Sequence, residues 1–184
     1  MKTTRSIVLC TMIIVQTVKA QNNNHKIYLE GTLSGGMQQS DVVAGVGGAI
    51  GVFLNKNSSI DIRVREVYNF RNMEISGPIN IHYRYNFDFG LFVGGGFAHH
   101  HEVGHHTYMH HPVESVMGME RNIFHRSGLG FEVGYNFKPF AKKGFFSVFY
   151  PSANVVINKM FMDSRSNPLV TANVGIRVGL KKFN

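Results

Sequence analysis

Apolar and polar residues alternate along several segments of this chain. Residues 79–87 do so without interruption, and residues 170–180 repeat the pattern near the end of the sequence. Because successive side chains of a β-strand point to opposite faces, each such segment predicts a strand with one apolar and one polar face. The same two-residue period predicts eight strands, near residues 26–34, 42–55, 58–70, 77–87, 88–99, 122–137, 144–158 and 168–181. The pattern therefore indicates an all-β fold.

The links between these strands predict which strand ends lie together. Tight turns are expected at residues 55–57 and 86–88, and a short link at 138–143. The longer links alternate with them, near residues 35–41, 71–76, 100–121 and 159–167. Short turns at one end and long loops at the other are typical of up-and-down barrels that cross a membrane. Within the segment 144–158, Pro151 and a pair of phenylalanines interrupt the alternation, which predicts a bulge or a switch in register.

The two faces of the strands favour a membrane barrel over a soluble one. A soluble eight-stranded barrel, such as a lipocalin, keeps its apolar face inside. Here one face is charged and glycine-rich, with Glu30, Asp61, Arg63, Arg65, His82, Arg84, Glu132 and Arg177. The other face is apolar, with Ile60, Ile62, Val64, Ile79, Ile81, Tyr83, Tyr85, Phe89, Leu91, Val93, Phe97, Leu129, Phe131 and Val133. Lipid requires an apolar outer wall, so we predict an eight-stranded antiparallel up-and-down transmembrane β-barrel.

The lumen of this barrel is expected to be filled. Eight strands leave an interior just wide enough for side chains, and unpaired buried charges would be costly. We therefore favour a plug of paired acids and arginines over a gated ion path. Gly45, Gly47 and Gly51 are expected to make room for arginines opposite them.

The N-terminal residues 1–20 have the pattern of a secretory signal. Lys2 and Arg5 precede a short apolar core, and Ala20 offers a small residue before the expected cleavage at Gln21. Residues 21–184 are one barrel domain by length. The only cysteine, Cys10, lies in the signal, so disulfides and cysteine chemistry are not expected in the exported protein.

Removal of the signal also changes the charge. Three basic residues lie in it, so the formal net charge falls from +8 to +5. The rest of the chain has no block of Lys and Arg, and a nucleic-acid partner is not expected.

Together, the signal, the eight alternating segments, the link lengths and the aromatic Phe183 close to the C-terminus resemble the small eight-stranded outer-membrane β-barrel family, of the OmpA-transmembrane-domain and OmpX type. The chain departs from that family at Asn184, which follows the aromatic residue. The resemblance implies export to the cell outer membrane, with outer-membrane lipid as a partner. It does not identify an extracellular partner.

Histidines are concentrated in the predicted extracellular loop near residues 99–121. The candidate metal ligands are His99, His100, His101, His105, His106, His110 and His111. Neutral imidazole is a common ligand of zinc, copper and nickel, so these three ions are the candidates. The letters His101-Glu102-x-x-His105 match a zinc-peptidase motif, but that motif needs a helix, which Gly104 and the exposed loop disfavour.

His125 and Ser127 suggest an enzymatic alternative. They share the phase of the apolar wall, and the His-x-Ser pair is similar to the lipid A deacylase barrels, where it forms an acyl-transfer site with an acidic partner. Here Gly128 follows the serine where that pattern continues with Asn, and Glu132 is expected to point inward. Glu114 or Glu120 would serve only if the loop folds back.

The sequence thus predicts a non-enzymatic integral outer-membrane barrel that requires no cofactor and whose His-rich external loop binds a transition metal. A structural or adhesive envelope barrel without a metal role is the first alternative. A lipid A-modifying barrel is the second.

Overall fold

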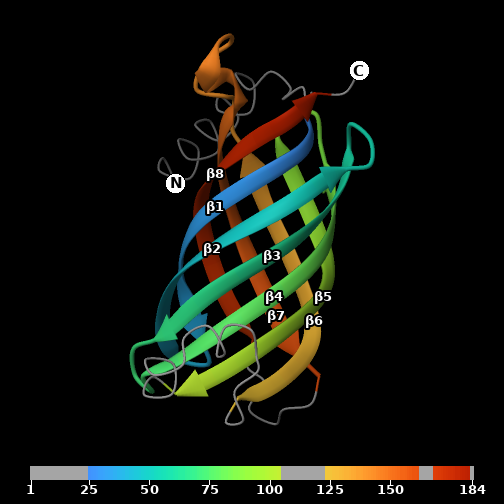
Figure 1. The fold of residues 1–184 in the computed structure, drawn as a ribbon. Helices are drawn as coiled ribbons and strands as arrows, with labels where there is room; N and C mark the ends of the chain where they lie inside the picture. The colour runs from blue at the N-terminus through green and yellow to red at the C-terminus, as the bar shows by residue number, and fades with distance from the viewer. Residues whose placement is uncertain (1–24, 105–122, 162–167, 183–184) are drawn as a thin grey trace, which may run out of the picture.

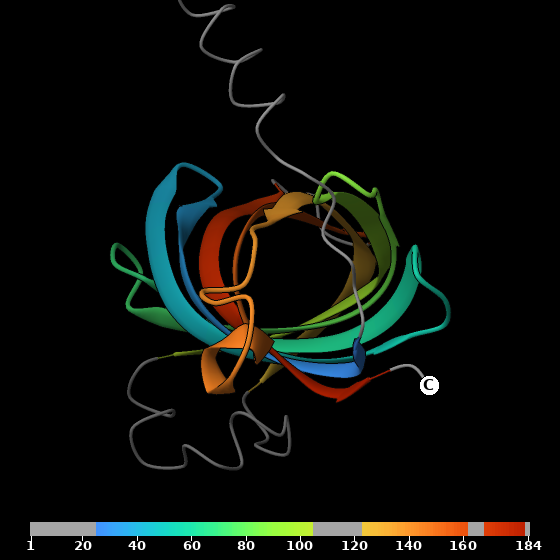
Figure 2. The same cartoon turned by 90° about the horizontal axis from the view of Figure 1, so that it is seen from above.

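The strands of this protein form one closed barrel. The computed structural model describes residues 25–104, 123–161 and 168–182. Its elements are β1 (His25–Gln38), β2 (Asp41–Phe53), β3 (Ser58–Asn69), β4 (Glu74–Asn86), β5 (Leu91–Gly104), β6 (Phe124–Asn136), a 3-10 turn η1 (Phe145–Val148), β7 (Phe149–Met160) and β8 (Leu169–Lys182). Each strand pairs antiparallel with the next, and β1 pairs with β8 to close the ring (Figures 1 and 2). The predicted fold class is confirmed.

All eight predicted strands are present, but two extend well beyond their predicted ends. β1 continues to Gln38 and β5 to Gly104, because both remain paired with neighbours on either side. The predicted long link at 35–41 is therefore wrong. It is a tight turn at Gln39 and Ser40, in which Gln39 adopts a φ of 60°.

The link between β6 and β7 also differs from the prediction. It is long, contains η1, and lies at the same end of the barrel as both termini of the described chain (Figure 1). Gly144 has a φ of 80° and its carbonyl accepts hydrogen bonds from Ser147, so the chain turns there instead of extending. β7 consequently begins at Phe149, and Pro151 lies just inside it rather than in a bulge. Of the predicted loop at 100–121, the first residues belong to β5 and the part from 105 onward lies outside the described residues, as does most of the predicted loop at 159–167.

The predicted apolar face forms the outer wall. Ile62, Tyr83 and Phe131 are 47%, 50% and 55% exposed, and apolar residues of the other strands are exposed in the same way. An outer surface of this kind, on a closed barrel with no free strand edge, matches contact with lipid. Within the described part of the chain, no helix is long and apolar enough to cross a membrane.

The predicted polar face forms the lumen, where every one of its eight charged or titratable residues is buried. Arg84 lies at the centre, with its Nε 2.9 Å from Asp61 Oδ2 and its Nη2 donating to Glu132 Oε2 at 2.7 Å. A second group gathers at Glu30, whose Oε2 accepts from the Nη2 atoms of Arg63 and Arg177 at 3.1 and 3.2 Å. These contacts are the charge pairing that a filled lumen requires.

Glycines make room for the side chains of this network, though not always for arginine. A Cβ on Gly47 would meet the side chain of Arg65, as predicted. Gly51 instead accommodates the ring of Tyr28, and Gly45 lies against the backbone of β3. The prediction that all three face arginines is therefore correct for Gly47 alone, because the other partners depend on strand register.

A matched pair of glycines tests the close packing of the lumen. A Cβ on Gly130 would lie 2.6 Å from Asn80 Nδ2 and 2.9 Å from Asn158 Oδ1, whereas a Cβ on Gly31 would meet nothing within 4 Å. We expect Gly130→Val to lower the free energy of unfolding by about 1–3 kcal/mol, the usual cost of overpacking. Gly31→Val should have no effect or a small stabilising one. Urea unfolding in lipid bilayers measures both, and equal effects would contradict a tightly packed lumen.

Candidate metal site

The extension of β5 divides the predicted histidines between two faces. His99 and His101 have the phase of Phe97 and point to the outside of the barrel, whereas His100 points into the lumen. His100 is 2% exposed, and its Nε2 lies 3.1 Å from Asn158 Nδ2. The structure thus separates His100 from the other two. Of the remaining candidates, His105, His106, His110 and His111 lie outside the described residues.

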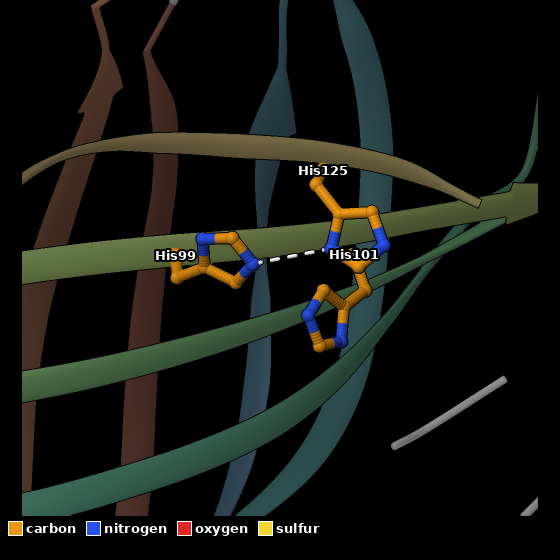
Figure 3. Close-up of side chains that lie close together, drawn as sticks. All are labelled: His99, His101 and His125. Atoms are coloured by element: carbon orange, nitrogen blue, oxygen red, sulfur yellow. Dashed lines mark hydrogen bonds between the residues drawn. The ribbon is translucent and has the colours of Figure 1, made fainter. Parts of the chain in front are cut away.

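A third histidine joins the outward pair from the neighbouring strand. His125 of β6 is the register partner of His101, and the two ring centroids are 4.8 Å apart. His99 and His101 are also 4.8 Å apart between centroids, and His99 and His125 are 5.6 Å apart. Figure 3 shows the three rings gathered together, with those of His99 and His125 directed at each other. We call His99, His101 and His125 the outer histidine cluster.

The spacing of the ring nitrogens matches a metal site. One nitrogen from each ring lies within 4.8 Å of the others, and His99 Nε2 is 3.3 Å from His125 Nδ1. Two nitrogens bound to tetrahedral zinc at about 2.0–2.1 Å are separated by about 3.3–3.4 Å. The His99–His125 pair therefore already has the separation of one edge of a zinc tetrahedron. His101, which is 7% exposed, has a ring nitrogen within 4.8 Å of the other two and is the third candidate ligand.

Ser127 holds His99 in the orientation that binding requires. Its Oγ lies 2.9 Å from His99 Nδ1. A metal bound through Nε2 requires the proton to stay on Nδ1, so the serine hydroxyl then accepts a hydrogen bond from Nδ1. Partners of this kind fix the tautomer and ring orientation of metal-binding histidines.

Charged residues near the cluster mostly belong to the other face. Arg126 and Glu102 form an ion pair at 3.1 Å, and both have the inward phase of their strands. Glu66 of β3 also has the outward phase. It lies two strands away from His101 of β5, and the residue between them on β4 is Gly77, which has no side chain.

One other group of possible ligands exists among the described residues. It consists of Asp61, His82 and Glu132 in the lumen. Arg84 already bonds to both carboxylates there, so a metal ion would have to displace a guanidinium. The outer histidine cluster is the better candidate.

His125 was not among the metal ligands predicted from sequence. Its outward phase is visible in the sequence, but its position beside His101 depends on the pairing of β5 with β6. The peptidase-like letters, in contrast, have no peptidase geometry over residues 101–104, because His101 and Glu102 point to opposite faces of an extended strand.

The described residues of the acyl-transfer alternative do not form a complete site. His125 and Ser127 face outward as predicted, but Ser127 bonds to His99 rather than to His125. Glu132 faces the lumen and bonds to Arg84, again as predicted. The other two acids considered, Glu114 and Glu120, lie outside the described residues.

Comparisons with known proteins identify relatives of the fold. No protein-family model and no curated protein matches the chain. Among solved structures, the chain is similar to Neisserial surface protein A, with 11% identity and a TM-score of 0.54 over 84% of this chain and 96% of that one. The N-terminal β-barrel domain of Pseudomonas aeruginosa OprF is 15% identical, with a TM-score of 0.49 over 88% and 99% of the two chains. The outer membrane protein OprG of the same organism is 8% identical, with a TM-score of 0.47 over 88% and 100%.

Proposed function

We propose that this chain, which has the fold of the small eight-stranded outer-membrane β-barrels, is a non-enzymatic outer-membrane protein that binds a transition-metal ion through its outer histidine cluster. The single observation that carries the proposal is the convergence of His99, His101 and His125 on one point of the outer wall. Three imidazoles and one open position are the ligand set of several zinc sites. Zinc, copper and nickel all suit imidazole, and copper is expected to bind most tightly.

The predicted export of the chain agrees with this proposal. Residues 1–20 are proposed as a cleaved signal, with the barrel in the outer membrane and the β5–β6 loop outside the cell. The histidines at 105, 106, 110 and 111, which belong to that loop, are proposed as further weak ligands.

Isothermal calorimetry on the refolded barrel tests the proposal. We expect one tight site for zinc or copper at about pH 7.5, and weaker binding in acid, because a metal ion must compete with protons for its imidazole ligands. An envelope barrel with no metal role would release no binding heat under either condition. That result would favour the structural or adhesive alternative.

Ser127 offers a finer test, because it touches the cluster without being a ligand. We expect Ser127→Ala to weaken metal binding by about 10–100-fold, as for other partners that orient a metal-binding histidine. Ser147→Ala is the matched control, since Ser147 bonds to Gly144 at the far end of the barrel. The same variant also tests the deacylase alternative. If lipid A loses acyl chains when the unchanged protein is expressed, and keeps them when Ser127→Ala is expressed, the non-enzymatic proposal is overturned.

A further inference from the structure

The link between β6 and β7 exposes a group of aromatic side chains. Phe145 and Phe146 of η1 are 72% and 61% exposed, and no residue of η1 is buried. Their rings pack on each other, with centroids 5.4 Å apart, and on the ring of Phe149, at 5.1 and 6.2 Å. We call these three residues the phenylalanine cluster. Exposed aromatic surface of this kind marks a contact site, because its burial away from water is favourable.

The phenylalanine cluster continues the apolar outer wall of the barrel. Phe149 has the outward phase of β7, which it shares with Val155, and its register partner on β8 is Val178. On the other arm of the link Phe140 is 59% exposed, and its backbone N–H donates to the carbonyl of Phe149 at 3.1 Å. Figure 1 shows the link, in orange, projecting beyond the end of the barrel. The cluster therefore joins the wall at the end where both termini of the described chain lie.

Lysines accompany the phenylalanine cluster at this end. Lys142 and Lys143 precede it directly and are exposed, and no acid occurs between residues 137 and 150. In the described part of the chain, the links and strand ends here, outside the lumen, carry one acid, Asp88, and seven lysines: Lys26, Lys56, Lys138, Lys142, Lys143, Lys181 and Lys182. This end of the barrel is therefore basic, and it complements an anionic partner.

We infer that the β6–β7 link docks on the headgroup layer of the membrane leaflet on the side of the chain termini, and that it selects anionic phospholipids. The rings of the phenylalanine cluster then enter the apolar boundary, while the ammonium groups of Lys142 and Lys143 contact phosphates. Aromatic rings combined with lysines are the side chains that suit this boundary. A protein partner would have to bring its own apolar surface, whereas the adjoining wall already requires lipid. The inference is independent of the proposed metal site.

Tryptophan fluorescence in vesicles of brominated lipid tests the inference. The chain has no tryptophan, so one substitution supplies a single reporter. Phe145→Trp is the reporter in the link, and Phe131→Trp is the matched reporter in the wall, since both side chains are exposed and aromatic. In phosphatidylglycerol vesicles we expect bromine near the headgroup to quench Phe145→Trp more than bromine near the bilayer centre does, and the reverse order for Phe131→Trp. In phosphatidylcholine the quenching of Phe145→Trp should be weaker.

Variants of the lysines test the selection of anionic lipid. With Lys142→Gln and Lys143→Gln added, Phe145→Trp should lose its stronger quenching in phosphatidylglycerol, whereas Lys159→Gln, near the other end of β7, should keep it. Heat-dependent gel migration checks that each variant is folded.

Two results would overturn the inference. If no bromine quenches Phe145→Trp while Phe131→Trp is quenched, the link lies in water and the docking on lipid is rejected in favour of a protein partner. If the quenching is equal in the two lipids and unaltered by the lysine changes, the selection of anionic phospholipid is rejected.

Discussion

Replacing His125 by alanine is expected to weaken transition-metal binding by more than about 100-fold. Among the described residues, the ring nitrogens of His125 and His99 already have the separation of one edge of a zinc tetrahedron, so loss of His125 removes a ligand rather than a partner of a ligand. The loss should therefore exceed the 10–100-fold effect of removing a second-layer contact. Because His125 is exposed and faces outward, the fold should tolerate the change.

Two control variants locate the effect. His100→Gln changes a histidine next to the cluster in sequence but on the lumen side, and should leave binding unchanged. A variant with His105, His106, His110 and His111 changed to Gln removes the loop histidines alone, and should weaken binding far less than His125→Ala. Calorimetry compares the metal affinity of the unchanged barrel with that of the three variants. A loop variant that loses binding while His125→Ala keeps it would move the site into the loop and reject the outer histidine cluster.

Arg84→Met is expected to destabilise the barrel by about 3–5 kcal/mol, the cost of stranding a buried charge. The guanidinium contacts Asp61 and Glu132 directly, and Glu30 Oε2 lies 3.7 Å from its Nη1. Its removal would leave carboxylates facing one another in a buried lumen. Urea unfolding in bilayers measures the free energy of unfolding. The temperature at which the folded band disappears from a gel is a second measure of stability.

Arg65→Met is the matched control for this experiment. Arg65 is as deeply buried as Arg84, but the described contacts of its guanidinium are to Thr171 and to the amide oxygens of Asn80 and Asn173. Its removal strands no carboxylate, so we expect less than half of the Arg84 effect. Adding Glu132→Gln and Asp61→Asn to Arg84→Met should recover part of the lost stability. Equal losses for the two arginines would show that the pairing in the lumen matters less than its filling.

The division of the chain into wall and lumen is visible in the sequence because strand geometry enforces it. Tyr83 and Arg84 must point to opposite sides of the same strand, and no other contact is needed to predict this. Ile62, Phe131 and Glu132 follow from the same rule. A one-residue error in phase would have reversed every assignment, so the agreement tests the rule over the whole barrel.

Strand ends and neighbours across strands could not be predicted in the same way. β1 extends through Gly35 and Gly36, which by themselves resemble a loop, because both have paired partners on two sides. His125 meets His101 because the register of β5 with β6 aligns them, and no periodicity within either strand encodes that register. For the same reason, the sequence did not indicate that Gly51 faces Tyr28.

Anomalous X-ray diffraction from crystals of the zinc-loaded barrel tests the outer histidine cluster most directly. The predicted result is one strong zinc peak on the outer wall, at about 2.0–2.1 Å from a nitrogen of each of His99, His101 and His125. A peak in the lumen beside His82, or one held by the β5–β6 loop while these three rings carry no metal, would contradict the proposed site.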